Sequence, residues 1–353
     1  MIKIQLTSVK YGMKLAKPIY TSEGKLLIDK GVLLKDSYVY KLLNFGINEV
    51  FVEWNRGEQI PEYVEAITYE IQEGTKDIMT EIVEGIQLSK KIDSGEVKEL
   101  VNKVLERLLN NKNTILCLAD LRTLDNYTFE HSLNVCLYSL IIGVALKYDI
   151  EKLESLGVGA LLHDIGKLVI PIDVLNKPSR LNDEEYKVIK QHVVDGLKLL
   201  DNISDIDEGV RVIVSDHHER YDGKGYPFGK QGRAIHEFAR IVAICDVYDA
   251  LTSDRVYKKR IPIHQAVEYL ISMGNHQFDY ALVKIFISQL AIYPEGTFIK
   301  LDTGQIAEVI KENQHWPTRP LVAIKHNKHG QQLKEFINVD LSKHLNIGIV
   351  HTI

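Results

Sequence analysis

Side chains of the metal-binding type recur on helical faces that should be buried, and this pattern constrains the fold more than any other feature of the chain. His163 and Asp164, for example, share a helical face with the apolar Ala160 because they lie three and four positions after it. A buried imidazole or carboxylate is costly unless it is paired or binds a metal ion. One such histidine alone would more often be a hydrogen-bonded core residue, but five helices with the same pattern favour a shared site. The sequence therefore predicts that five helices converge.

Apolar residues at three- and four-residue steps place these helices along the chain. The helix that begins near Asn182 also carries a start signal, because Asn182 and Glu185 have the spacing of a capping box. The expected helices and their ligand-type residues are 133–146 opened by His131, 154–168 with His163 and Asp164, the helix from 182 with His192, a helix through Val210 and Val214 that reaches His217 and His218, and 238–251 with Asp246.

The donor atoms indicate which ions such a site would hold. Imidazole and carboxylate ligands without a thiolate suit iron, manganese or zinc. Seven ligand-type residues exceed the need of one ion, and a carboxylate such as Asp164 can bridge two, so the pattern indicates a binuclear centre. Cys117, Cys136 and Cys245 lie in apolar surroundings without CxxC spacing, and we interpret them as reduced core thiols.

Composition and charge exclude some classes of protein. Of the 353 residues, 45% are hydrophobic and 26% are charged, which is typical of a globular chain with a full-sized core. The formal net charge of -5 argues against a dedicated nucleic-acid binder, which is expected to be basic. The first residues lack the pattern of a signal peptide, and the most apolar run, 135–146, is too short to span a bilayer. We therefore expect a cytoplasmic protein that neither binds DNA nor inserts into a membrane.

Four regions differ in their pattern. Residues 1–58 carry short alternating runs separated by glycines, which is typical of a small α+β module. Residues 59–114 have apolar residues at helical spacing and are interpreted as a helical connector that either forms a homodimer contact or packs on its own chain. Residues 115–292 are expected to form a helical domain that holds the ligand-type residues, and residues 293–353 predict a small β module. The expected fold is thus mainly α, with small α+β and β modules at its two ends. The expected strands are 25–28, 49–52, 297–301, 305–310 and 320–325.

Five segments in order resemble the HD-GYP family of cyclic di-GMP phosphodiesterases, a subgroup of the HD metal-dependent phosphohydrolase superfamily. HDIGK at 163–167 resembles the signature of the superfamily, and HHERYDGKGYP at 217–227 resembles the element that defines the subgroup. DNYTFEHS at 125–132, DVYDALT at 246–252 and DRVYK at 254–258 resemble further motifs of the family. The resemblance covers about half of the chain and implies an HD-type helical bundle there.

The resemblance also assigns metal ligands position by position. It implies that one ion is held by His131, His163, Asp164 and Asp246, and the other by Asp164, His192, His217 and His218. Members of the family with a third ion carry a glutamate one helical turn before the first histidine, where this chain has Tyr127. The resemblance therefore implies two divalent ions, with iron and manganese as the expected metals.

The implied reaction is hydrolysis of cyclic di-GMP to linear pGpG, with GMP left open as a further product, by a hydroxide that two metal ions activate. Lys167 follows Asp164 by one turn, so we expect it to stabilise phosphate charge or to protonate the leaving oxygen. The alternative is an ion pair between these two residues. Asp249 follows Asp246 by one turn and is expected to orient a ligand histidine.

Further substrate contacts are expected from two segments, one that contains Arg255 and Lys258 and one that is the loop 223–227. Arg255 and Lys258 are three residues apart and would bind phosphate or a guanine edge, unless they form a solvated helix end. Tyr226 is expected to contact the substrate from the loop 223–227. This loop is either a shaped turn beside the pocket, a docking surface for diguanylate cyclases, or a plain turn.

Three other functions stay open on the sequence alone. An HD phosphohydrolase acting on a nucleotide or on the stringent-response messenger would need only four ligands and one ion, so His192, His217 and His218 argue against it. A sensor that binds cyclic di-GMP without turnover would usually have lost metal ligands. A preference for cyclic GMP-AMP is not distinguished, because few residues that would read the bases are identifiable.

Overall fold

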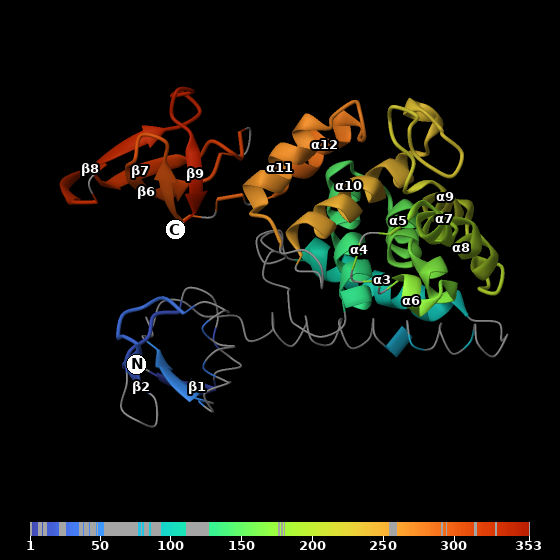
Figure 1. Cartoon of the computed structure of the whole chain (residues 1–353), viewed down its shortest axis with the longest axis horizontal. Helices are drawn as coiled ribbons and strands as arrows, with labels where there is room; N and C mark the ends of the chain where they lie inside the picture. Colours follow the sequence, from blue (N-terminus) through green and yellow to red (C-terminus); the bar gives the residue numbers. More distant parts are fainter. Residues whose placement is uncertain are drawn as a thin grey trace. The chain divides into compact units, whose positions relative to one another are not determined.

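The parts of the chain that the computed structural model describes lie mainly after residue 92. It describes residues 2–5, 13–20, 26–34, 49–52, 93–110, 127–175, 181–253, 260–290, 295–313, 316–328 and 330–352 with single positions between them, and only the backbone for 127–130. Contacts divide the chain into two units, residues 1–65 and residues 66–353. The helical body and the larger β-sheet both belong to the second unit (Figure 1).

The helical body is assembled around α5, which packs against α4 on one side and α9 on another (Figure 1). Helix α10 packs against α4 and α9, and α8 packs against the 3-10 turn η4. Apolar side chains such as Leu140, Leu156, Ile213 and Ile241 are fully buried in one core. The elements are α3 (Ser94–Asn110), α4 (Tyr127–Ala145), α5 (Ile150–Leu162), η4 (Ile165–Val169), α6 (Ile172–Leu175), α7 (Asp183–Lys190), α8 (His192–Leu200), α9 (Glu208–Asp216), η5 (Gly232–Ala234), α10 (Glu237–Thr252), α11 (Ile263–Ser272) and α12 (Tyr280–Ser288).

Two of the predicted helices were too long. The predicted helix 154–168 ends at Leu162 and continues as η4, and the predicted helix from 182 divides at Gln191 into α7 and α8. The capping box between Asn182 and Glu185 is present at the start of α7, as predicted. Apolar spacing of three and four residues persists through such turns, so the sequence pattern does not reveal where an α-helix tightens into a 3-10 turn.

Gly166 explains how η4 and α8 come together. A Cβ atom at this position would lie 1.8 Å from the carbonyl oxygen of His192 and 2.6 Å from the backbone nitrogen of Gly196. Both obstacles are backbone atoms of α8, so only glycine fits at this contact. The approach brings the Asp164 end of η4 against the first turn of the helix that carries His192.

The first unit contains two pairs of antiparallel strands in its described part. Strand β1 (Ile2–Gln5) pairs with β4 (Glu49–Val52), and β2 (Ile19–Tyr20) pairs with β3 (Leu26–Ile28). The strands predicted at 25–28 and 49–52 are therefore confirmed. Much of the predicted connector, including its apolar positions between 64 and 76, lies outside the described residues.

The second β module is a five-stranded antiparallel sheet in the order β8-β7-β6-β5-β9. Its strands are β5 (Phe298–Leu301), β6 (Ile306–Lys311), β7 (Leu321–His326), β8 (Gln332–Asp340) and β9 (Ile349–Thr352). Residues on alternate positions, such as Ile299 and Leu301 on β5, are buried. The three strands predicted here are confirmed as β5, β6 and β7. The fold class is also confirmed: the core is mainly helical, with small β modules toward both ends of the chain.

Candidate metal centre

The structure brings the seven ligand-type residues predicted from the sequence into one cluster, in which five are buried and His218 and Asp246 are partly buried. His131 comes from α4, His163 and Asp164 from the turn between α5 and η4, and His192 from the first residue of α8. His217 and His218 follow α9, and Asp246 lies on α10. Two overlapping groups have ligand atoms within 4.8 Å of one another, and Asp164 belongs to both. The groups are Asp164, His192, His217 and His218, and His131, His163 and Asp164.

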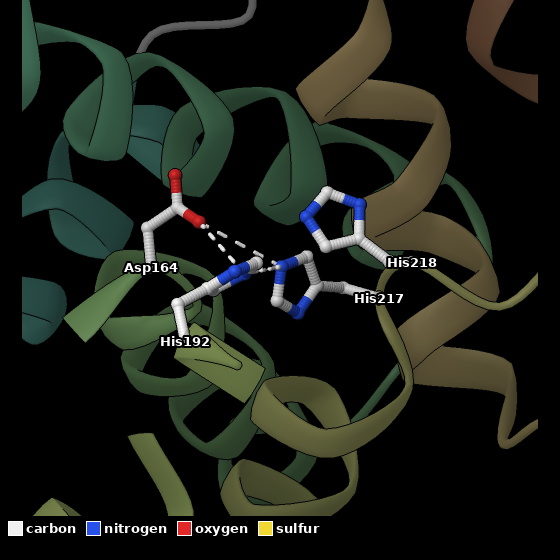
Figure 2. A group of neighbouring side chains, drawn as sticks. All are labelled: Asp164, His192, His217 and His218. Atoms are coloured by element: carbon white, nitrogen blue, oxygen red, sulfur yellow. Dashed lines mark hydrogen bonds and ion pairs between the residues drawn. The ribbon is translucent and has the colours of Figure 1, made fainter. Parts of the chain in front are cut away.

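Asp164 presents one carboxylate oxygen to each group. Its Oδ1 atom lies 3.5 Å from Nε2 of His192 and 3.7 Å from Nε2 of His217, and Figure 2 shows both imidazoles turned toward this oxygen. Its Oδ2 atom lies 3.3 Å from Nε2 of His163 and 3.7 Å from Nε2 of His131. The two oxygens of one carboxylate thus face two sets of imidazoles, so this residue is placed where it could be shared by two cations.

The two remaining ligand-type residues complete the sets. Nε2 of His131 lies 3.2 Å from Oδ1 of Asp246, so Asp246 belongs with His131 and His163, the histidines that face Oδ2 of Asp164. The His218 ring lies beside that of His217, with the ring centroids 4.1 Å apart (Figure 2). Each set therefore combines imidazole with carboxylate, without a thiolate.

The histidines are held by their Nδ1 atoms. Nδ1 of His163 and of His192 each lies 2.7 Å from a backbone carbonyl oxygen, and Nδ1 of His217 lies 3.1 Å from another. A carbonyl oxygen only accepts hydrogen bonds, so each Nδ1 carries the proton and donates it. In a neutral imidazole the lone pair is then on Nε2, the atom that faces Asp164 in all three residues.

Two buried atoms in the cluster have no hydrogen-bond partner among the described residues. They are Nε2 of His163 and Oδ1 of Asp164. Buried polar groups without a partner are rare in folded proteins and point to an ion or water at the site. One atom is an imidazole nitrogen and the other a carboxylate oxygen, and both are atom types that bind divalent iron, manganese or zinc. The residues present therefore fit a divalent metal cofactor.

Comparison with known proteins identifies the family. The model of the HD domain family matches residues 97–282, which is more than half of the chain. The chain belongs to the HD domain family. A second model, described as a KOW domain associated with an HD domain, matches residues 298–353, the five-stranded sheet. The resemblance inferred from the sequence motifs is confirmed at the level of the family.

Similar proteins support the same family. A cyclic di-GMP phosphodiesterase of Pseudomonas aeruginosa is 34% identical over 238 residues, which cover 67% of this chain and 57% of that protein. The chain thus spans little more than half the length of that relative. The 3′3′-cGAMP-specific phosphodiesterase 1 of Vibrio cholerae is 37% identical over 147 residues, covering 41% of this chain and 33% of that one. The solved structure of an HD-GYP-type protein of Bdellovibrio bacteriovorus shares the fold, with a TM-score of 0.50, 17% identity, and coverage of 81% of this chain and 97% of that chain.

We call the cluster of seven ligand-type residues the HD site. For three of these residues, the electrostatic environment favours the protonation state that binds a metal ion. Burial lowers the pKa of His192 to about 4, and burial together with the neighbouring His217 lowers the pKa of His218 well below its ordinary value. Burial by itself would raise the pKa of Asp164, but Lys167 and His163 outweigh it and hold that pKa well below its ordinary value. At neutral pH these two histidines are therefore neutral and Asp164 is ionised.

His131 differs from the other histidines of the HD site. Burial opposes its charged form, but hydrogen bonds with Asp246 and Asp249 raise its pKa to about 9. Nδ1 of His131 lies 2.7 Å from Oδ2 of Asp249, so this carboxylate contacts the ligand-type histidine from behind, where the sequence predicted an orienting residue. Asn134 donates to the other oxygen of Asp249 over 2.9 Å. A cation bound at Nε2 of His131 would replace the proton that this environment otherwise favours.

Lys167 lies at the edge of the HD site, with 29% of its side chain exposed. Its ammonium group contacts Oδ2 of Asp164, so the ion pair that the sequence left as an alternative is present. The group is therefore next to the carboxylate that faces both sets of imidazoles, and its partial exposure leaves it within reach of a ligand.

The loop after His218 folds back on the HD site. Tyr226 donates its backbone N–H to the carbonyl oxygen of His218 over 3.3 Å, and its ring stacks on the His218 ring with centroids 4.8 Å apart. A Cβ atom on Gly225 would lie 2.3 Å from the backbone nitrogen of Arg220, so this close return of the chain requires glycine. The buried Glu219 carboxylate accepts the backbone N–H of Phe228 over 2.6 Å and holds the far side of the loop.

Some of the predicted site residues lie outside the described part of the chain, and some residues that support the site were not predicted. Arg255 and Lys258 lie outside the described residues, as does the side chain of Tyr127. Asn134 was not predicted as a site residue, although its spacing of three from His131 was an available signal. The pair of Lys230 and the buried Asp216, with 2.7 Å between the charged atoms, was also missed.

The described residues also bear on two simpler expectations. Cys136 and Cys245 are buried and form no disulfide, and burial raises the pKa of the Cys136 thiol to about 12. Cys117 lies outside the described residues. None of the described helices combines the length and the apolar character that crossing a bilayer requires.

Proposed function

We propose that this chain is a metal-dependent phosphodiesterase that hydrolyses cyclic di-GMP to linear pGpG, with further hydrolysis to GMP left open. The observation that carries the proposal is the orientation of Asp164, whose two oxygens face two different sets of imidazoles. The printed activities of the relatives, phosphodiesterases that act on cyclic dinucleotides, support the substrate class.

The proposed ligands of one ion are His131, His163, Asp164 and Asp246, and those of the other are Asp164, His192, His217 and His218. Iron or manganese is the proposed metal, because the donor set is imidazole and carboxylate. Two divalent cations held there would neutralise a phosphodiester and lower the pKa of a bound water.

The protein groups around the site then divide the remaining work. Asp249 fixes the ring of His131 from behind, because its carboxylate contacts Nδ1. The Lys167 ammonium, beside Asp164 and partly exposed, stabilises charge on the phosphate or protonates the leaving 3′ oxygen. Arg255 and Lys258 stay proposed contacts to phosphate or guanine, and Tyr226 stays a proposed substrate contact.

The proposed partners and location follow from the sequence rather than from the site. The loop 223–227 is proposed as a surface for diguanylate cyclases, and the connector 59–114 as a homodimer contact. The proposed location is the cytoplasm.

Turnover of cyclic dinucleotides tests the proposal. Protein purified without oxygen and supplied with Mn²⁺ or Fe²⁺ is incubated with cyclic di-GMP and, separately, with cyclic GMP-AMP, and products are separated by chromatography. We expect linear pGpG from cyclic di-GMP, and loss of this product in Asp164→Asn but not in the surface control Glu184→Gln. Tight binding of cyclic di-GMP without any product would make the protein a sensor and contradict the proposal. Faster turnover of cyclic GMP-AMP would replace the substrate but keep the reaction.

A further inference from the structure

Lys190 lies between two aromatic rings at the margin of the metal centre. Its ammonium nitrogen is 4.9 Å from the centroid of the Tyr186 ring and 5.6 Å from that of the Tyr226 ring. The Tyr226 ring in turn stacks on the ring of His218, with an interplanar angle of 28°. A continuous series of contacts therefore leads from the metal centre outward through Tyr226 to Lys190 and Tyr186.

Lys190 differs from several other lysines of the helical body in what its ammonium group contacts. Among the described residues, no carboxylate lies within ion-pair distance of its ammonium group, whose contacts are the two ring faces. Ring faces attract a cation without neutralising it, so the positive charge stays available to an anion. By contrast, four other lysines of the helical body are each paired with a carboxylate: Lys167, Lys177, Lys187 and Lys230.

The two tyrosines differ in exposure. The Tyr186 side chain on α7 is 48% exposed, whereas Tyr226 is half-buried against His218. Exposed aromatic rings beside an unpaired cation form a common platform for nucleotides, because a base stacks on the ring while the cation contacts phosphate. Neither a buried core contact nor a surface ion pair accounts for this arrangement.

A cyclic dinucleotide has a half that the metal centre does not hold. Only one of its two phosphates reacts at a time, so the second phosphate and its neighbouring base need contacts elsewhere. We propose that Tyr186, Lys190 and Tyr226 form a subsite for this second nucleotide, in which Lys190 binds the non-reacting phosphate and Tyr186 stacks on a base. This inference rests on the proposed function.

The subsite has a consequence for selectivity. Contacts to the non-reacting half lower KM and position the reacting phosphate for a dinucleotide, but they offer nothing to a small phosphodiester. The enzyme would therefore discriminate between two substrates that present the same chemistry to the metal ions. Bis(p-nitrophenyl) phosphate is a suitable small substrate, because it has one phosphodiester and no second phosphate.

The test compares Lys190→Gln with the wild type on cyclic di-GMP and on bis(p-nitrophenyl) phosphate. Loss of a charged contact to phosphate is expected to raise KM for cyclic di-GMP roughly ten- to hundred-fold. The loss in kcat/KM should be at least about ten-fold larger for cyclic di-GMP than for the small diester. Lys187→Gln is the matched control, because Lys187 lies on the same helix and pairs with Glu184 at 2.8 Å.

A second pair of variants tests the aromatic part. Tyr186→Ala should raise KM for cyclic di-GMP roughly five- to hundred-fold, because stacking on one base is lost. Tyr186→Phe keeps the ring and should stay close to the wild type. Neither Tyr186 nor Lys190 is buried, so the variants should unfold at the wild-type temperature and keep the wild-type metal content, both of which are measured.

The outcomes separate this inference from the proposed function. Wild-type turnover of cyclic di-GMP with an unchanged KM in Lys190→Gln would overturn the subsite and leave the function standing. Equal losses on both substrates, or loss of metal from Lys190→Gln, would also overturn it, because the residue would then support the metal centre. A wild type that hydrolyses the small diester but no cyclic dinucleotide would overturn the proposed function and the subsite together.

Discussion

Replacement of Asp249 by alanine removes the carboxylate that contacts the metal centre from behind. Asp249 is fully buried and accepts three hydrogen bonds, from Nδ1 of His131 over 2.7 Å, from Asn134 over 2.9 Å and from the hydroxyl of Ser253 over 3.0 Å. Alanine leaves these three donors without their acceptor. The effect should appear in the stability of the fold and, separately, in metal affinity.

The magnitude follows from the burial of the donors. His131 is only 5% exposed, so its Nδ1–H cannot form a hydrogen bond with water once the carboxylate is removed. The loss of this hydrogen bond should lower the free energy of unfolding by about 1–3 kcal/mol. Asn134 and Ser253 are half-buried and can be partly rehydrated, so the total should be about 2–4 kcal/mol. Loss of a carboxylate that orients a ligand histidine typically weakens metal binding by about ten- to hundred-fold.

Two assays separate these effects. Urea denaturation in the presence of a chelator measures the free energy of unfolding without a contribution from bound metal. Titration of the metal-free protein with Mn²⁺ then measures affinity for the site that contains His131. Asp249→Asn keeps one acceptor oxygen and should lie between the wild type and Asp249→Ala. Wild-type metal affinity in Asp249→Ala, together with unchanged stability, would refute the argument that this carboxylate positions His131.

Two further variants test how the polypeptide supports the site. Gly166→Ala places a Cβ atom against backbone atoms of α8 that cannot move independently, so it should destabilise the fold by at least the roughly 1–3 kcal/mol of ordinary overpacking and reduce metal content, as measured by denaturation and elemental analysis. Lys230→Ala leaves the buried Asp216 carboxylate without its ammonium partner; because Lys230 is itself 35% exposed, the expected loss of stability in urea is about 1–3 kcal/mol.

Each of these variants has a control on the same chain. Gly95→Ala introduces a Cβ atom no closer than 3.4 Å to any neighbour and should leave stability within about 0.5 kcal/mol or raise it. Lys198→Ala removes a surface lysine, 68% exposed, from its pair with Asp195 and should change stability by less than about 1 kcal/mol. Controls that destabilise as much as Gly166→Ala or Lys230→Ala would contradict the assignment of those effects to close contact and burial.

The candidate site could be anticipated from the sequence because its physics is unusual. Histidines on apolar helical faces conflict with the ordinary cost of burying polar groups, and a shared site resolves the conflict for all of them at once. The structure does bring His131, His163 and His192 together around Asp164. What the periodicity did not contain is the direction of the Nδ1 atoms of His163 and His192, which depends on backbone carbonyls one turn earlier in the chain.

Other features could not be anticipated for identifiable reasons. The strands β8 and β9 were missed, since they form the two edges of their sheet and much of their described surface is exposed, which removes the clean alternation of a half-buried strand. The helix break at Gln191 leaves no mark on apolar spacing. The position of Lys190 between two rings was also invisible, because Tyr186 and Tyr226 lie 40 residues apart in sequence and meet only through the loop that returns to His218.

Metal stoichiometry tests the central claim, that Asp164 lies between two cation sites, most directly. The wild type, His131→Ala and His192→Ala are purified without oxygen, loaded with Mn²⁺, desalted and subjected to elemental analysis, with circular dichroism confirming that each variant is folded. We expect about two ions per chain in the wild type and about one in each variant, because each substitution removes a ligand from a different set. One ion per chain in the wild type, lost entirely in both variants, would contradict the claim.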